Sequence, residues 1–305
     1  MSINIAVIGE CMLELRQTRG LATGNSKPMV MGFGGDTLNT SLYLARNEIS
    51  ASYVTALGDD PNSDWLVDEW TKEGIDCELI ERAQNSVPGM YLIDTDEDGE
   101  RSFFYWRKDS PASQLFNDEA KVAQLFEKLA KFEYLYLSGI SLAILPEEAL
   151  TRLFNYLAKY RESGGRLIFD GNYRPTLWTS EAVAQQSYRT MYQMTDIALP
   201  TLEDEAMLFH YSSPEEVIEA IKADGVKEIV VKMGDEGCVS SFNGSVEFVA
   251  AKPTKPVDTT AAGDSFNAAY LAARFKDENV VDACNCGHSL ASQVIQNKGA
   301  IIPRD

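Results

Sequence analysis

Short apolar runs alternate along the chain with segments whose apolar residues recur at helical spacing. Residues 3–8 form a short β-branched run that ends at Gly9, which predicts a buried strand. Residues 36–47 then carry apolar side chains three and four positions apart, which predicts a helix with Asp36 or Thr37 as its N-cap. The chain therefore begins with a strand followed by a helix.

The same alternation continues toward the C-terminus. Further strands are predicted at residues 53–57, 134–137, 166–169, 197–199 and 229–231. Helices are predicted at residues 63–73, 146–163, 180–194, 202–209 and 214–223. Strands alternating with helices are typical of βαβ units around a mainly parallel sheet. We expect an α/β fold.

Two hairpins interrupt this alternation. Residues 90–94 and 101–106 flank an acidic turn that ends in Asp-Gly, and a second hairpin is predicted within residues 238–249. The first hairpin follows the early strand and helix units as an insertion, and residues 11–16 could pair with it. We therefore expect a small antiparallel flap that stands off the main sheet within one domain, residues 1–305.

Composition narrows the class of protein. The 305 residues are 45% hydrophobic and 24% charged, which excludes a disordered or fibrous chain. Acidic residues outnumber basic ones 46 to 27, for a net charge of -19, so nucleic acid and anionic membranes are disfavoured partners. The sequence has no apolar run near the ~18 residues of a membrane span and no signal peptide pattern. We expect a soluble cytoplasmic protein.

The cysteines predict neither disulfides nor a zinc site. Their number is odd, they are scattered, and no four-ligand spacing appears. The five are Cys11, Cys77, Cys238, Cys284 and Cys286.

The most informative stretch is Asp-Thr-Thr-Ala-Ala-Gly-Asp-Ser-Phe at residues 258–266, followed by an apolar helical run. A helix that begins near Gly263 would aim free N–H groups and a positive dipole end at a ligand, which suits phosphate. Asp264 at this terminus could accept the proton of a hydroxyl that attacks phosphorus. The pattern is equally compatible with an aspartate that only caps the helix.

A second glycine-rich stretch, residues 32–39, reads Gly-Phe-Gly-Gly-Asp-Thr-Leu-Asn. Its polar side chains could hydrogen-bond the hydroxyls of a sugar, or the stretch could be a plain turn that leads into a helix. No Gly-Lys-Ser/Thr follows, and Gly9 begins no dinucleotide-binding fingerprint. These absences count against a P-loop kinase and an NAD enzyme.

Aromatic residues lie beside arginine on the first hairpin. Tyr91, Tyr105, Trp106 and Arg107 would suit a sugar acid, with ring faces against carbon and a guanidinium against the carboxylate. The alternative is an aromatic face that packs the hairpin on the core and leaves Arg107 exposed.

Two further segments follow predicted strands. Asn172, Tyr173 and Arg174 leave the carboxyl end of a strand, where open α/β sheets bind ligands. The turn made by Lys232, Met233, Gly234, Asp235, Glu236 and Gly237 could hold a nucleotide or could be only a β-turn.

Together these stretches resemble the ribokinase-like carbohydrate kinases of the PfkB family over essentially the whole chain. Residues 258–269 fit the signature of that family, and residues 32–39 with Tyr105-Trp106-Arg107 fit the branch that acts on 2-keto-3-deoxygluconate. The resemblance implies a three-layer α/β/α fold with a mainly parallel central sheet. It also implies a small β-sheet lid from parts of about residues 10–33 and 87–108.

The resemblance implies ATP-dependent phosphorylation of the 6-hydroxyl of 2-keto-3-deoxygluconate, with ATP and Mg²⁺ bound. Asp264 would be the catalytic base, beside an anion hole of Ala261, Ala262 and Gly263. Substrate would contact Gly34, Gly35, Asp36, Thr37, Leu38, Asn39, Tyr91, Tyr105, Trp106, Arg107 and Arg174. Nucleotide would contact Asn172, Tyr173, Arg174, Lys232, Met233, Gly234, Asp235, Glu236, Gly237 and residues 261–264.

The chain departs from the family at two places. Ala261 stands where the wider family often has glycine. Leu202 takes the Asn place of an Asn-x-x-Glu motif, and Glu205 takes the Glu place, where it would order water around Mg²⁺. Arg107, Arg174 and Lys232 would supply positive charge within an acidic protein.

Other functions stay open on sequence alone. One is another kinase of this family that acts on ribose, fructose or a nucleoside. Another is a non-catalytic sensor of sugar acid or nucleotide. The aromatic flap could also pair with a second copy of the chain, giving a homo-oligomer.

Overall fold

A central eight-stranded sheet runs through the computed structural model, which describes residues 3–17, 25–95 and 101–304. In sheet order the strands are β14 (Ser245–Ala250), β13 (Gly237–Phe242), β12 (Glu228–Lys232), β11 (Ile197–Ala198), β10 (Arg166–Asp170), β9 (Tyr134–Ser138), β1 (Asn4–Ile8) and β4 (Ser50–Val54). Every neighbouring pair from β4 to β12 is parallel, and β12, β13 and β14 pair antiparallel. The mainly parallel sheet that the sequence predicts is confirmed.

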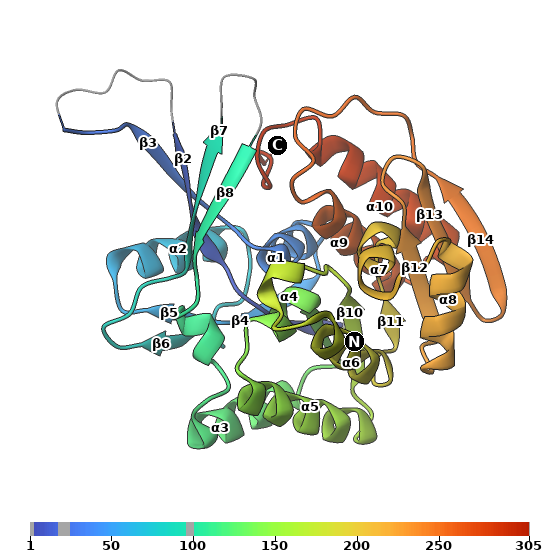
Figure 1. Ribbon diagram of the computed structural model, residues 1–305, viewed down its shortest axis with the longest axis horizontal. Coiled ribbons are helices and arrows are strands. Elements are labelled where there is room, and N and C mark those ends of the chain that lie inside the picture. Colours follow the sequence, from blue (N-terminus) through green and yellow to red (C-terminus); the bar gives the residue numbers. More distant parts are fainter. Residues whose placement is uncertain (1–2, 18–24, 96–100, 305) are drawn as a thin grey trace.

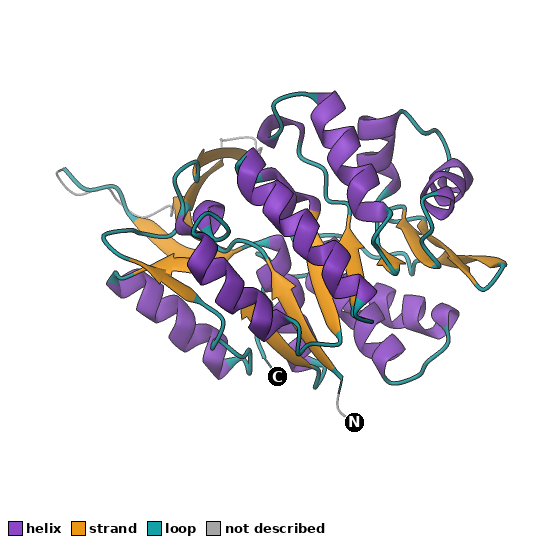
Figure 2. Ribbon diagram, turned by 90° about the horizontal axis from the view of Figure 1, so that it is seen from below, coloured by secondary structure: helices purple, strands orange, loops and turns teal. Residues whose placement is uncertain are grey.

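Helices cover both faces of this sheet (Figure 2). One core packs under α1 (Asp36–Arg46), α2 (Pro61–Lys72), α9 (Ala262–Phe275) and α10 (Val280–Val294). The other packs under α3 (Glu119–Leu129), α4 (Gly139–Ala143), α5 (Glu147–Glu162), α6 (Glu181–Tyr192), α7 (Leu202–Phe209) and α8 (Pro214–Ala223). Ile5 and Val7 of β1 enter the first core, while Ala6 and Ile8 enter the second. The strand is therefore apolar on both faces, as a buried parallel strand must be.

A second, four-stranded sheet stands off the main one beside α2 (Figure 1). Its order is β3 (Met29–Gly34), β2 (Met12–Gln17), β7 (Met90–Thr95) and β8 (Arg101–Trp106). The outer pairs are antiparallel, but β2 and β7 run parallel, so the expected purely antiparallel flap is wrong in this detail. No hairpin joins β2 directly to β7, so these two inner strands are not forced to pair antiparallel. The predicted turn at residues 96–99 lies outside the described residues.

Two local boundaries differ from expectation. The predicted strand at residues 53–57 is divided, because β5 (Ala56–Gly58) leaves the main sheet and pairs with β6 (Glu81–Ala83). The N-cap of α1 is Gly35, not Asp36 or Thr37, and it makes no side-chain cap. A Cβ at Gly35 would lie 2.2 Å from the carbonyl oxygen of Glu10, so only glycine fits where these segments cross.

The five cysteines are free thiols, as expected. Within residues 3–17, 25–95 and 101–304, no helix combines the length and apolar character that crossing a membrane requires.

Candidate active site

A cavity of about 1790 Å³ opens between the smaller sheet and the carboxyl ends of the parallel strands. This is the edge at which open α/β sheets bind ligands. The predicted site residues that line it are Gly34, Gly35, Asp36, Asn39, Tyr91, Tyr105, Arg107, Asn172, Arg174, Lys232, Met233, Gly234, Asp235, Glu236, Gly237, Ala261, Ala262, Gly263 and Asp264. Segments more than 200 residues apart in the chain thus meet at one cavity.

The first turn of α9 borders this cavity. Ala261 is the N-cap and adopts a left-handed backbone, with φ 60° and ψ 18°. This bend carries the chain into the helix, whose first N–H groups have no partner within the helix itself. Together with the positive end of the helix dipole, these groups would suit an anion.

Asp264 lies in this first turn and is held by a neighbouring amide. The Asn39 side chain donates a hydrogen bond to Asp264 Oδ2 over 2.7 Å. Burial raises the pKa of Asp264 to about 8, and the nearby carboxylate of Asp36 adds to the rise. Such a group is a strong base once it has lost its proton.

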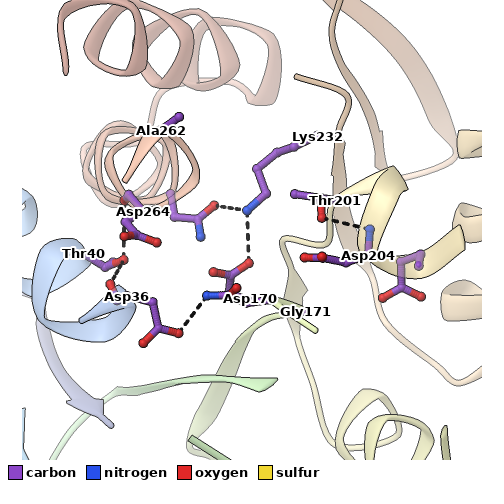
Figure 3. Close-up of polar contacts among 12 residues, drawn as sticks. Asp36, Thr40, Asp170, Gly171, Thr201, Asp204, Lys232, Ala262 and Asp264 are labelled. Carbon is purple, nitrogen blue, oxygen red and sulfur yellow. Dashed lines mark hydrogen bonds and ion pairs between the residues drawn. The ribbon is translucent and has the colours of Figure 1, made fainter. Parts of the chain in front are cut away.

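An ammonium group is fixed beside the same turn (Figure 3). Lys232, at the end of β12, lies 3.0 Å from Asp170 Oδ1 and donates to Asn267 Oδ1 over 3.0 Å. A Cβ placed on Gly263 would lie 3.6 Å from Lys232 Nζ. The ammonium therefore lies close to the first turn of α9, and its charge lowers the pKa of Asp264.

Asp36 faces the cavity from the start of α1. The Asn172 side chain donates to Asp36 Oδ2 over 2.9 Å (Figure 3). Burial raises the pKa of Asp36 as well. The cavity thus holds two carboxyl groups, Asp36 and Asp264, with raised pKa values.

The smaller sheet contributes aromatic rings and one arginine to the cavity. Tyr91 and Tyr105 lie with ring centroids 5.9 Å apart, and both line the cavity. Arg107 lines it too and forms an ion pair with the buried Glu10. Trp106 does not line the cavity and is 57% exposed. Successive strand residues point to opposite faces, so Tyr105 and Trp106 cannot both face inward.

Four more predicted site residues lie outside the lining, and each of them has other neighbours. Leu38 is fully buried in the core under α1. Thr37 is buried, and its hydroxyl lies 3.2 Å from Tyr53 Oη. Tyr173 packs into the second core.

Glu205 is the fourth. Its carboxyl group is buried and accepts a hydrogen bond from Tyr192. Burial raises the pKa of Glu205 to about 8, so the group is mostly uncharged at neutral pH. Its neighbour Asp204 does line the cavity, and Asp204 Oδ1 lies 3.3 Å from Arg174 Nη1.

The sequence interpretation missed Asp170 and Asp204. Asp170 is the last residue of β10, and Asp204 lies in α7 just beyond β11. Position at the carboxyl end of a predicted parallel strand was the signal that could have identified Asp170.

Each of the three expected cations is already paired with a carboxylate. Arg107 pairs with Glu10, Arg174 with Asp204 and Lys232 with Asp170. Backbone N–H groups at the start of α9 would therefore have to supply much of the attraction for an anion.

Known proteins resemble the chain over its whole length. The family model described as pfkB family carbohydrate kinase matches residues 2–305. A 2-dehydro-3-deoxygluconokinase of Escherichia coli is 46% identical over 313 residues, which cover 100% of this chain and 99% of that protein.

Two solved structures share the fold. A 2-dehydro-3-deoxygluconokinase of Thermotoga maritima has a TM-score of 0.85 at 20% identity, over 99% of this chain and 95% of that one. A putative ribokinase II of Escherichia coli in complex with ATP and Mg²⁺ has a TM-score of 0.83 at 21% identity, over 98% and 94%. The sequence similarity, the fold and a helix N-terminus that would suit phosphate all agree. The chain therefore belongs to the pfkB family of carbohydrate kinases.

Proposed function

We propose that the protein is an ATP-dependent kinase that phosphorylates the 6-hydroxyl of 2-keto-3-deoxygluconate, also called 2-dehydro-3-deoxygluconate. The observation that carries this proposal is the placement of Asp264 and the Lys232 ammonium at the first turn of α9. A base, a cation and an anion site then lie together at one end of a cavity. The name of the 46% identical relative supports the choice of substrate.

In this proposal Asp264 accepts the proton of the 6-hydroxyl as its oxygen attacks the γ-phosphorus. Phosphoryl transfer asks a protein mainly to position the reactants and to balance developing charge. The N–H groups of Gly263 and Asp264 would contact the transferred phosphoryl oxygens, since that of Ala262 already donates to the Thr259 carbonyl, and Lys232 would add positive charge beside them. Asn39 holds Asp264 in place through its hydrogen bond.

The surroundings also fit a nucleotide-bound Mg²⁺. Two carboxylates that line the cavity, Asp170 and Asp204, lie near Lys232, at which the proposed nucleotide loop of residues 232–237 begins (Figure 3). Mg²⁺ is commonly held by one or two carboxylates together with phosphate oxygens and water. Bound there, it would offset the charge of the phosphates.

The smaller sheet would act as the lid over the sugar acid, formed by parts of about residues 10–33 and 87–108. Tyr91 and Tyr105 would contact the carbon chain, and Arg107 would bind the carboxylate. A lid that covers the site excludes water and so suppresses ATP hydrolysis. The outward face, with Phe104 and Trp106 more than half exposed, would be the surface for a homo-oligomer. The reaction would take place in the cytoplasm.

The test is a coupled ADP-release assay with 2-keto-3-deoxygluconate and a panel of ribose, fructose and nucleosides. We expect the keto-deoxy acid to give a kcat/KM at least ~10² higher than any neutral sugar, since only it can pair with an arginine. Preference for a neutral sugar would identify another kinase of the family. No ADP release with any substrate would favour a sensor.

A further inference from the structure

A buried carboxylate lies directly behind the arginine of the lid. Glu10 follows β1, is 2% exposed and is not among the residues that line the cavity. Its Oε2 lies 2.5 Å from Nη2 of Arg107, whose side chain is 12% exposed. The Ser110 hydroxyl donates a hydrogen bond to Glu10 Oε1. The guanidinium of Arg107 therefore borders the cavity and is held by the buried carboxylate of Glu10, which does not line it.

Within the described residues the chain passes four times between the main sheet and the smaller sheet, and Glu10 lies on or beside each of these passages. It lies on the first passage itself, between β1 and β2. On the second passage, between β3 and α1, a Cβ at Gly35 would lie 2.2 Å from the carbonyl oxygen of Glu10. On the third, just before β7, a Cβ at Gly89 would lie 3.0 Å from its Oε1. The fourth, after β8, carries Arg107 and Ser110.

We propose that Glu10 is a positioning residue that orients Arg107 toward the carboxylate of the sugar acid, an inference that rests on the function proposed above. A guanidinium presents its five donors in one plane, and paired recognition of a carboxylate requires that this plane be fixed. Arg107 Nε is buried and has no acceptor among the described residues. Among the described residues the guanidinium has one ion pair, between Nη2 and Glu10, so this contact is the one that can hold its plane; Asp36 interacts with it only through its charge.

Because the side chains of Glu10 and Arg107 are both largely buried, each is stabilised by the charge of the other. Loss of one leaves the other charged and unpaired in the interior, which destabilises the fold. Replacement of Arg107 alone therefore mixes two effects, the lost contact to substrate and the unpaired carboxylate of Glu10. A test of positioning must separate them.

A double-mutant cycle makes this separation, with steady-state kinetics for both substrates. The four proteins are wild type, Glu10→Gln, Arg107→Met and the double variant. Glu10→Gln keeps the shape of the side chain and removes its charge. We expect it to raise KM for 2-keto-3-deoxygluconate ~10-fold or more, with kcat and KM for ATP within ~3-fold of wild type.

If Glu10 acts through Arg107, the double variant should have the same KM for the sugar acid as Arg107→Met. It should also melt at a higher temperature than Arg107→Met, because no unpaired carboxylate remains. An unchanged KM in Glu10→Gln, or effects that multiply in the double variant, would overturn the proposal. A wild-type protein without activity on this acid would instead refute the proposed function.

Glu73 offers a matched control away from the cavity. It pairs with Arg46 over 2.7 Å, and both side chains are at most 20% exposed. Glu73→Gln should lower stability while leaving KM for the sugar acid unchanged, so a KM rise there would mean that instability alone explains the effect. If Glu10→Gln does not fold, Glu10→Asp replaces it, since this variant keeps the charge but withdraws it from Arg107. The same rise in KM is expected, and a wild-type KM would refute the positioning role.

Discussion

Replacement of Asp264 by asparagine should make the protein more stable at alkaline pH while it removes the base. In the folded protein burial raises the pKa of Asp264 from 3.8 to about 8. A group whose folded pKa lies above its unfolded value contributes stability that is fully present below the unfolded pKa. That stability is lost as the pH rises through the folded pKa.

The size of the effect follows from the shift. Each pKa unit corresponds to about 1.4 kcal/mol, so the full loss between pH 4 and pH 8 has an upper limit of ~6 kcal/mol. Asp264 borders a water-accessible cavity, which screens its charge, and we expect ~2 kcal/mol between pH 5 and pH 9. Asparagine carries no charge and keeps an acceptor oxygen for the Asn39 amide, so Asp264→Asn should not show this loss.

The assay is chemical unfolding of wild type and Asp264→Asn at several pH values from 5 to 9. Titrating groups far from Asp264 are common to both proteins and cancel in the difference of unfolding free energies, whereas neighbours such as Asp36 contribute through their coupling to Asp264. This difference should grow with pH in favour of the variant. Two parallel curves would refute the reasoning.

The raised pKa of Asp264 also predicts how the kinetics of the wild type depend on pH. Because Asp264 must be deprotonated to act as a base, kcat/KM for the sugar acid should rise with pH through an apparent pKa of about 8. Asp264→Asn should lose ~10² or more in kcat with a modest change in KM. A variant with nearly wild-type turnover would contradict the assignment of the base.

Three further substitutions test the surroundings of the site. Lys232→Met leaves Asp170 buried without its cation, so it should cost ~3 kcal/mol of unfolding free energy in urea titrations. Glu205→Gln should gain stability over wild type as the pH rises from about 4.5 to about 8, because over this range the native carboxyl group must take up a proton on folding, and the gain should level off above pH 8; a stability difference that does not change with pH would contradict the raised pKa. Gly287→Ala would place a methyl group 2.7 Å from the Phe266 ring and should lower stability by ~1–3 kcal/mol, measured as a lower melting temperature.

Elements with strong local signals could be predicted from sequence. α7 and α8 have the predicted boundaries because a side-chain cap precedes each, from Thr201 and Ser213. α10 was not predicted, since it carries Gly287 and several polar residues. Packing against α9 stabilises it, and the absent side chain at Gly287 leaves room for an aromatic ring.

The candidate site, too, has parts that local sequence signals predict and parts that they do not. Its glycine-rich segments are local signals, and most of the residues marked from them line the cavity. Contacts between distant segments could not be predicted, such as Lys232 with Asp170, 62 positions away in the chain. Nor could the inward or outward orientation of neighbouring residues such as Tyr105 and Trp106, which depends on the register of β8 against β7.

Ala261 has a consequence for how the loop before α9 is ordered. A non-glycine residue in the left-handed region costs of order 1 kcal/mol, and that cost is taken from the stability of the fold. In exchange the methyl group restricts the backbone in the unfolded chain more than glycine would. Ala261→Gly would therefore remove backbone strain from the folded state and increase the conformational freedom of the unfolded chain. The native residue keeps the turn before α9 in fewer conformations, so less ordering would remain to oppose the binding of a nucleotide proposed there.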